Sequence, residues 1–169
     1  EQFDIVICLG VIQHTPSSEE TIACLIKQLK PGGMLVIDHY PPGIHESLGA
    51  RLLRPLFLRL PSSLSFKLCK WLVAFLWPLH RLVFKRKGRR GLRLLMRYSP
   101  IIDYQGAYPL SDSLQKEWAM LDTHDALTDF YKHKKSVEDI RHILSQHNLE
   151  DIKVVRANGV EARARKKAR

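Results

Sequence analysis

Residues 3–37 decide the fold, and they read FDIVICLGVIQHTPSSEETIACLIKQLKPGGMLVI. Residues 3–9 are mostly apolar and rich in β-branched side chains, which is typical of a strand buried on both faces in a parallel sheet. Ser17 opens a capping-box pattern, and apolar residues follow it at helical spacing. Residues 30–33 (KPGG) end that helix, and residues 34–37 predict a second buried strand. This order predicts a βαβ unit with a right-handed crossover.

The charge of the chain is concentrated in its middle. The 169 residues include 27 Lys and Arg against 17 Asp and Glu, a net charge of +10. Residues 45–97 alone hold 13 Lys and Arg and one acid. We expect these residues to form a basic amphipathic helical insert, kinked near Pro78, with a basic loop over residues 85–93. The longest uncharged stretch within residues 45–97, residues 71–80, is too short for a membrane-spanning helix.

The last third has an ordinary globular pattern. It predicts a helix from about Asp112 into the 120s and a second, capped helix after Ser136. A strand follows at residues 152–155, and Asn158-Gly159 predicts a hairpin with a type I′ turn. We therefore expect residues 1–44 to form the βαβ part of a domain and residues 98–169 to complete that domain.

Two motifs in this order resemble the class I S-adenosylmethionine-dependent methyltransferases. They are FDIVICLGVIQHTP at residues 3–16 and LKPGGMLVID at residues 29–38. The resemblance implies an α/β fold with the C-terminal part of a Rossmann-like methyltransferase sheet, closed by an antiparallel hairpin. It also implies S-adenosylmethionine as cofactor and methyl transfer to a small or lipid-like acceptor.

The sequence departs from that family in its cofactor-binding elements. None of the nine glycines forms the G-x-G of the family's cofactor loop. The acidic residue that binds the ribose hydroxyls in the family is missing too. We therefore expect the chain to be a C-terminal portion of such a methyltransferase, inactive alone.

Candidate site residues follow the two predicted strands, because ligands of open α/β sheets bind outside the carboxyl ends of the strands. By resemblance, Leu9, Gly10 and Gln13 would line the methionine end of the cofactor. His14 is a candidate catalytic base or substrate contact, or else it orders the turn. His39 is a candidate substrate contact, or else it satisfies the end of its strand. Asp122, Asp125 and Tyr131 fall in a segment that could return over the site, although the polarity of a surface helix is the better explanation for them.

The insert at residues 45–97 has three interpretations. It could be a lid over a hydrophobic substrate, a surface that lies on an anionic membrane, or a nucleic-acid surface. We favour a lid that also contacts a membrane surface, and the plain alternative is an ordinary helical cap whose charges are solvated. Nucleic acid is the weakest of these, because the aromatic residues fall on apolar helix sides where we expect core. The alternative to an enzyme is therefore a non-catalytic module that binds an anionic membrane or nucleic acid.

The remaining residue types narrow the cellular setting. Three cysteines without a C-x-x-C spacing favour a reducing compartment, so we expect a cytoplasmic protein, either free or peripheral to a membrane. The dispersed histidines lack metal-ligand spacing, and we expect no metal.

Overall fold

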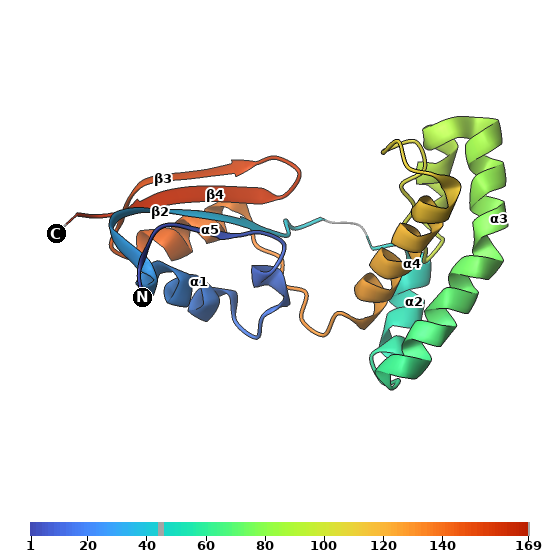
Figure 1. Ribbon diagram of the computed structural model, residues 1–169, viewed down its shortest axis with the longest axis horizontal. Helices are drawn as coiled ribbons and strands as arrows, with labels where there is room; N and C mark the ends of the chain where they lie inside the picture. The colour runs from blue at the N-terminus through green and yellow to red at the C-terminus, as the bar shows by residue number, and fades with distance from the viewer. Residues whose placement is uncertain (44–45, 169) are drawn as a thin grey trace. The chain divides into compact units, whose positions relative to one another are not determined.

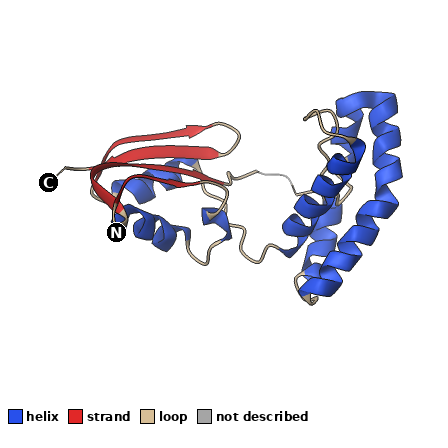
Figure 2. Ribbon diagram, viewed as in Figure 1, coloured by secondary structure: helices blue, strands red, loops and turns tan. Residues whose placement is uncertain are grey.

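The computed structural model describes residues 1–43 and 46–168. The chain divides into two compact units, which are described separately here: an α/β unit, Glu1–Ile44 with Tyr131–Arg169, and a helical unit, His45–Phe130. Figure 2 shows that all the strands lie in the α/β unit. The elements are β1 (Phe3–Cys8), η1 (Ile12–His14), α1 (Ser18–Lys27), β2 (Leu29–His39), α2 (Leu48–Phe57), α3 (Ser62–Leu95), α4 (Asp112–Thr128), α5 (Val137–Ser145), β3 (Leu149–Arg156) and β4 (Val160–Lys166).

The α/β unit is a four-stranded sheet in the order β1-β2-β4-β3. β1 pairs with β2 in parallel, and the other two pairings are antiparallel. Helices α1 and α5 lie on the same face of this sheet (Figure 1). Their apolar sides and the facing side chains of β2, β3 and β4 form one core. The predicted fold class is therefore confirmed, with its βαβ unit and terminal antiparallel pair.

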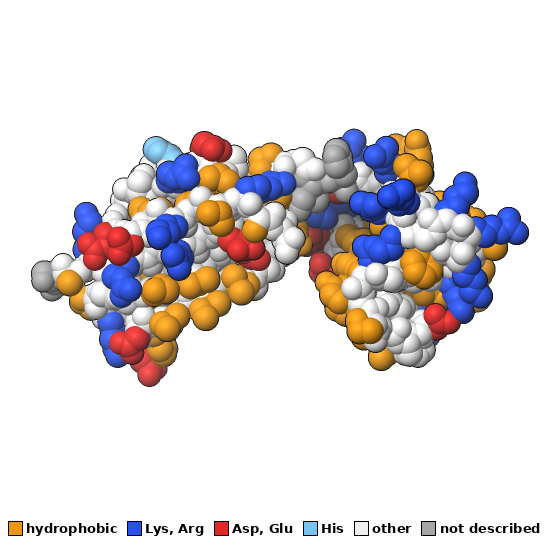
Figure 3. All heavy atoms as spheres, turned by 90° about the horizontal axis from the view of Figure 1, so that it is seen from above, with side chains coloured by type: hydrophobic (Ala, Val, Ile, Leu, Met, Phe, Trp, Pro, Cys, Tyr) orange, Lys and Arg blue, Asp and Glu red, His pale blue; other side chains and the backbone are white. Residues whose placement is uncertain are grey.

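β1 differs from the prediction, because only one of its faces is covered. Val6 and Cys8 pack against the core under the sheet. Ile5 and Ile7 point to the other face and are 58% and 63% exposed. Both helices of the unit lie on one face, so in the described part of the chain no element covers the outer face of β1. Figure 3 shows a row of hydrophobic side chains on the surface of this unit.

The turn from α1 into β2 is tighter than expected. Ser17 accepts a hydrogen bond from the Glu20 amide at 3.2 Å, which confirms the predicted cap. The helix ends at Lys27, before the KPGG sequence, and β2 begins at Leu29. A Cβ atom at Gly33 would lie 3.0–3.1 Å from three backbone oxygens, so glycine lets β1 and β2 approach closely there.

The C-terminal hairpin is confirmed, but its turn is not type I′. Arg156 pairs with Val160, which leaves a three-residue connection. A type I′ turn needs positive φ at two central residues. Neither Asn158 nor Gly159 is among the residues with positive φ. A Cβ atom at Gly159 would lie 3.0 Å from the His39 carbonyl oxygen, so this glycine serves close approach to β2 instead.

The helical unit extends further than the insert we expected. Its core joins buried side chains of α2 and α3 to Ala119 and Leu127 of α4, so residues 98–130 group with it, and only residues 131–169 return to the α/β unit. Arg54 of α2 donates hydrogen bonds to the carbonyl groups of Ala126 and Asp129.

Helix α3 also runs through the segment that we expected to be a loop. Residues 85–93 are helical except at Gly88, whose φ of 57° and ψ of −158° break the helix. Pro78 lies inside the helix, so the break falls ten residues later than predicted.

A buried polar chain ties α3 to the segment before α4. The His80 ring contacts Asp103 Oδ2 through Nδ1 at 2.9 Å and Ser99 Oγ through Nε2 at 2.7 Å. Asp103 also accepts hydrogen bonds from the backbone and side-chain nitrogens of Gln105. A carboxylate only accepts, so Nδ1 carries a proton and donates it to Asp103. Ser99 is only 8% exposed, which points to a structural role for this chain of contacts.

Candidate functional site

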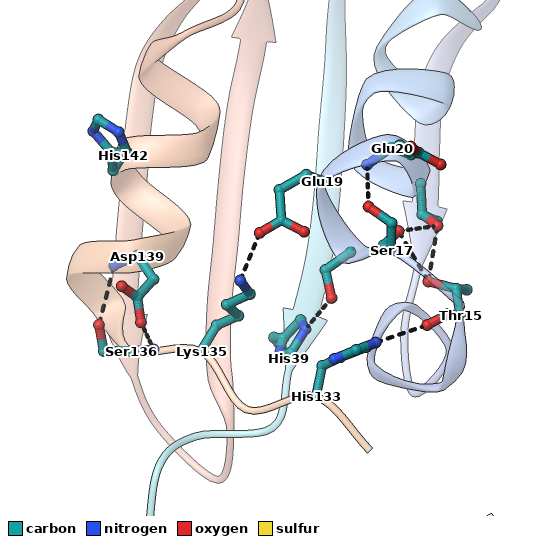
Figure 4. A network of polar contacts seen from close by, with 12 residues as sticks. Thr15, Ser17, Glu19, Glu20, His39, His133, Lys135, Ser136, Asp139 and His142 are labelled. Carbon is teal, nitrogen blue, oxygen red and sulfur yellow. Dashed lines mark hydrogen bonds and ion pairs between the residues drawn. The ribbon is translucent and has the colours of Figure 1, made fainter. Parts of the chain in front are cut away.

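The carboxyl ends of β1 and β2 are joined by residues 131–135, which return from the helical unit. The His133 amide donates to the Gln13 carbonyl at 3.0 Å, and the Lys135 amide donates to the Tyr40 carbonyl at 2.9 Å. The His133 ring contacts the Thr15 carbonyl through Nε2 at 3.0 Å (Figure 4). This segment therefore fixes both strand ends at the edge where ligands bind in α/β sheets.

Gly10 lies in the loop that leaves β1. Its backbone nitrogen donates to Asp38 Oδ1 at 2.6 Å, which ties the loop to the end of β2. Its φ is +71°, and a Cβ built there would have no heavy atom within 4 Å. Leu9 beside it is 55% exposed. The backbone at Leu9 and Gly10 is therefore exposed at the carboxyl end of β1.

A hollow of about 510 Å³ adjoins this loop on the uncovered face of the sheet. Leu9 and Asp38 form its end nearest the strand termini. Its full lining is Leu9, Val36, Ile37, Asp38, Lys153, Val155, Glu161, Ala162 and Arg163.

Gln13 is the most unusual polar residue at the site. Its side chain is 0% exposed, and neither Nε2 nor Oε1 has a hydrogen-bond partner among the described residues. An unpaired buried amide costs about 1–3 kcal/mol, so such groups are rare without a reason. A ligand that pairs with this amide would supply one.

His14 is held at the mouth of the site. Its Nδ1 lies 3.2 Å from the Tyr131 carbonyl oxygen, and its ring meets the Tyr40 ring edge-on at 5.3 Å. A carbonyl only accepts, so Nδ1 donates and a neutral ring carries its lone pair on Nε2. This is the tautomer that a base needs. The Tyr131 contact also orders the turn, so both predicted roles of His14 are compatible with the geometry.

His39 lies beneath the site and is only 2% exposed. Its Nδ1 donates to its neighbouring carbonyl, Tyr40 O, at 3.1 Å, and its Nε2 accepts from Ser18 Oγ at 2.9 Å. Burial lowers the pKa of His39 more than any other effect. The hydrogen bond to Tyr40 and the charge of Asp38 raise this pKa, and electrostatic interactions with Lys135 and His133 lower it, so the net shift is downward. Both ring nitrogens are engaged, so the geometry favours the second prediction for His39, satisfaction of the strand end.

Two residues that the sequence did not single out for this site complete it. Lys135 pairs with Glu19 of α1 at 2.5 Å, a hydrogen bond that lowers the pKa of the Glu19 carboxyl (Figure 4). His133 contacts the backbone carbonyl groups of Gln13 and Thr15, which are far away in sequence. Asp122 lies in the helical unit, where it accepts a hydrogen bond from Tyr104 at 2.6 Å. Asp125 lies in the same helix α4 of that unit.

Comparison with known families bears on this N-terminal segment. Residues 1–37 match the family model described as "Methyltransferase domain". They are part of a class I S-adenosylmethionine-dependent methyltransferase domain. No curated protein matches the chain. The matched methyltransferase segment contains β1, η1 and α1, and it ends inside β2, two residues before His39.

The methyltransferase segment fits part of the cofactor that its family uses. Gly10 provides open backbone, and Gln13 provides a buried amide without a partner. The 169 residues contain no G-x-G loop. An exposed backbone and a buried amide without a partner are thus the groups that the carboxyl end of β1 offers to such a cofactor, and the sequence supplies no G-x-G loop for the rest of it.

Proposed function

We propose that the protein transfers the methyl group of S-adenosylmethionine to a small or lipid-like acceptor at the carboxyl ends of β1 and β2. The observation that carries this proposal is the unpaired amide of Gln13, which lies in the matched methyltransferase segment beside an open glycine. A site that is assembled from backbone contacts of residues 131–135 supports it. Bound S-adenosylmethionine would supply a methyl group that is already activated on a sulfonium.

The protein's contribution is then mainly positioning and exclusion of water. Gln13 would pair with a polar group of the cofactor through its amide. Asp38 holds the Gly10 amide and so fixes the loop against which the cofactor would lie. His14 would take the proton that an oxygen or nitrogen acceptor loses.

The substitution Gln13→Leu tests this proposal in the protein expressed from its complete reading frame. Removing an unpaired buried amide relieves its desolvation cost, so the melting temperature should hold or rise. S-adenosylmethionine binding, measured by calorimetric titration, should fall at least about tenfold, the loss of one hydrogen bond to a charged group. Gln115→Leu is the matched control, because Gln115 is also buried but lies in the helical unit. It should leave binding unchanged.

The 169-residue chain alone should bind S-adenosylmethionine weakly, because its sequence lacks the G-x-G loop. Micromolar binding by this chain would show that the cofactor site lies elsewhere than we propose. Lack of S-adenosylmethionine binding by the complete gene product, with the fold intact, would overturn the proposed function.

A further inference from the structure

Helix α3 exposes an apolar ridge along its outward side. Trp71 is 76% exposed and Phe75 is 82% exposed. Helix α3 buries a different side, which includes Cys69, Val73 and Trp77. The ridge consists of residues three or four apart, all at least 39% exposed: Leu64, Leu68, Trp71, Phe75, Leu79 and Leu82. At 1.5 Å per residue it is about 27 Å long.

Positive charge lies directly beside this ridge. Lys67, Lys70 and Lys85 are exposed and lie about a quarter-turn around the helix from the apolar row. Helix α3 carries nine Lys and Arg and no Asp or Glu. Helix α4, on the core side, carries four acidic residues and one Lys. Figure 3 shows Lys and Arg side chains beside hydrophobic ones on the helical unit. The outward surface of α3 is therefore both apolar and positively charged.

We propose that α3 lies flat on the surface of an anionic lipid bilayer. Leu, Trp and Phe side chains of the ridge would enter the boundary between headgroups and acyl chains, and the flanking lysines would contact acidic headgroups. Among the described residues, no helix combines the length and apolar character needed to cross a membrane. An in-plane orientation uses the ridge and the charges at the same time, and no step of this inference depends on methyl transfer.

Other occupants match the surface less well. A nucleic acid would satisfy the lysines and could stack on Trp71, but it offers no partner for a leucine-rich ridge about 27 Å long. A second copy of the chain would bury the ridge, but it would bring two helices of nine positive charges each together. Only a lipid bilayer with acidic headgroups, which is anionic at its surface and apolar below it, is complementary to both the apolar ridge and the positive charge beside it.

Vesicle co-sedimentation of the complete protein tests this inference. We expect binding to phosphatidylcholine vesicles that contain phosphatidylserine and much weaker binding to phosphatidylcholine alone. Phe75→Ser should weaken binding about tenfold or more, because it removes an aromatic ring from the acyl boundary. Leu121→Ser is the control, since Leu121 is 56% exposed on α4 and should have no effect. Thermal melts of both variants check that the fold is kept.

The charges and the depth of insertion are tested separately. Replacing Lys85, Arg86, Lys87, Arg89 and Arg90 by Ser should weaken binding to the anionic vesicles at least about tenfold, since one basic side chain near the surface contributes about fivefold. Brominated phosphatidylcholine should quench the fluorescence of Trp71, and Trp71→Phe should remove that quenching. Binding that Phe75→Ser leaves unchanged, a preference for RNA or DNA over vesicles, or concentration-dependent dimers without lipid binding would each overturn the proposal.

Discussion

At the scale of single residues, His14 and His39 follow neighbouring strands, and their surroundings give them different chemistry. His14 is partly buried at the mouth of the site, with one ring nitrogen committed to a carbonyl. His39 is buried with both nitrogens committed. A charge on His39 would be desolvated and would meet the cations of Lys135 and His133. His39 links α1 to the end of β2 through Ser18, and His14 is the residue that we propose for the chemistry.

The buried neutral state of His39 predicts how stability depends on pH. An unfolded chain takes up a proton on histidine at about pH 6.5, whereas the lowered pKa of His39 delays this in the folded chain. The unfolded state then binds more protons, so stability falls as pH falls from about 6.5 toward the lowered pKa. His39→Gln should cost about 1–3 kcal/mol at pH 7.5 through poorer pairing of Ser18. That cost should shrink at pH 5.

Denaturant unfolding at several pH values measures this difference. His142→Gln is the control for replacing a histidine at the surface, because His142 is exposed on α5. The lowered carboxyl pKa of Glu19 affects stability only below about pH 4.5, outside the range that is compared. A His39→Gln cost that is equal at pH 7.5 and pH 5 would contradict the neutral, desolvated state.

His14 gives the second prediction at this scale. In the complete protein, His14→Ala should lower kcat by about 10²- to 10⁴-fold with little change in S-adenosylmethionine binding if the ring accepts a proton. The loss should be smallest at high pH, where the acceptor ionises without help. Tyr40→Phe keeps the ring that meets His14 edge-on and should leave kcat nearly unchanged. Equal losses in binding and kcat would instead assign His14 to ordering the turn.

At the scale of elements, periodicity in the sequence predicts most helices and strands but not what covers them. The spacing after Ser136 correctly predicts α5 and its capping box, because caps and apolar stripes are local. An apolar strand has the same sequence pattern whether one face or two are covered, so the exposure of Ile7 could not be predicted. The His133 and Lys135 amides contact Gln13 and Tyr40 through backbone atoms alone, which leave no signature in residue identity. The helix break at Gly88 likewise depends on one positive φ.

The uncovered face of β1 gives a prediction for the 169-residue chain. Ile5 and Ile7 are exposed, and β1 pairs only with β2 among the described strands. An apolar edge strand of this kind promotes association between copies. Ile7→Lys should lower the association seen in sedimentation equilibrium and change the free energy of unfolding by no more than about 0.5 kcal/mol. Leu121→Lys, on exposed α4, should leave association as it is, and an equal effect of both changes would mean that β1 is not the contact.

At the scale of the whole molecule, the two units have separate hydrophobic cores and differ in net charge. The helical unit holds 14 Lys and Arg against 7 Asp and Glu, which leaves 13 against 10 for the α/β unit from the totals of 27 and 17. Each unit also contains a cysteine whose reaction with a thiol reagent can be followed separately. Cys69 is buried in the helical unit, where burial raises the pKa of its thiol to about 11. Cys8 belongs to the α/β unit, and its thiol pKa is raised by burial and by Asp38.

The separate cores predict that the helical unit opens without the α/β unit. Asp103→Ala leaves His80 and Gln105 without their shared acceptor, and losing a buried partner of this kind costs about 3–5 kcal/mol. Cys69 reacts with a thiol reagent only when its unit opens, so its labelling rate should rise about a hundredfold or more. The labelling rate of Cys8 should stay the same.

The experiment uses a Cys24→Ser background, since Cys24 is exposed and would label at once. Asp112→Ala is the control, because Asp112 pairs with Arg81 at the surface, where such pairs contribute at most about 1 kcal/mol. Parallel acceleration of Cys8 and Cys69 by Asp103→Ala would show that the two units unfold as one.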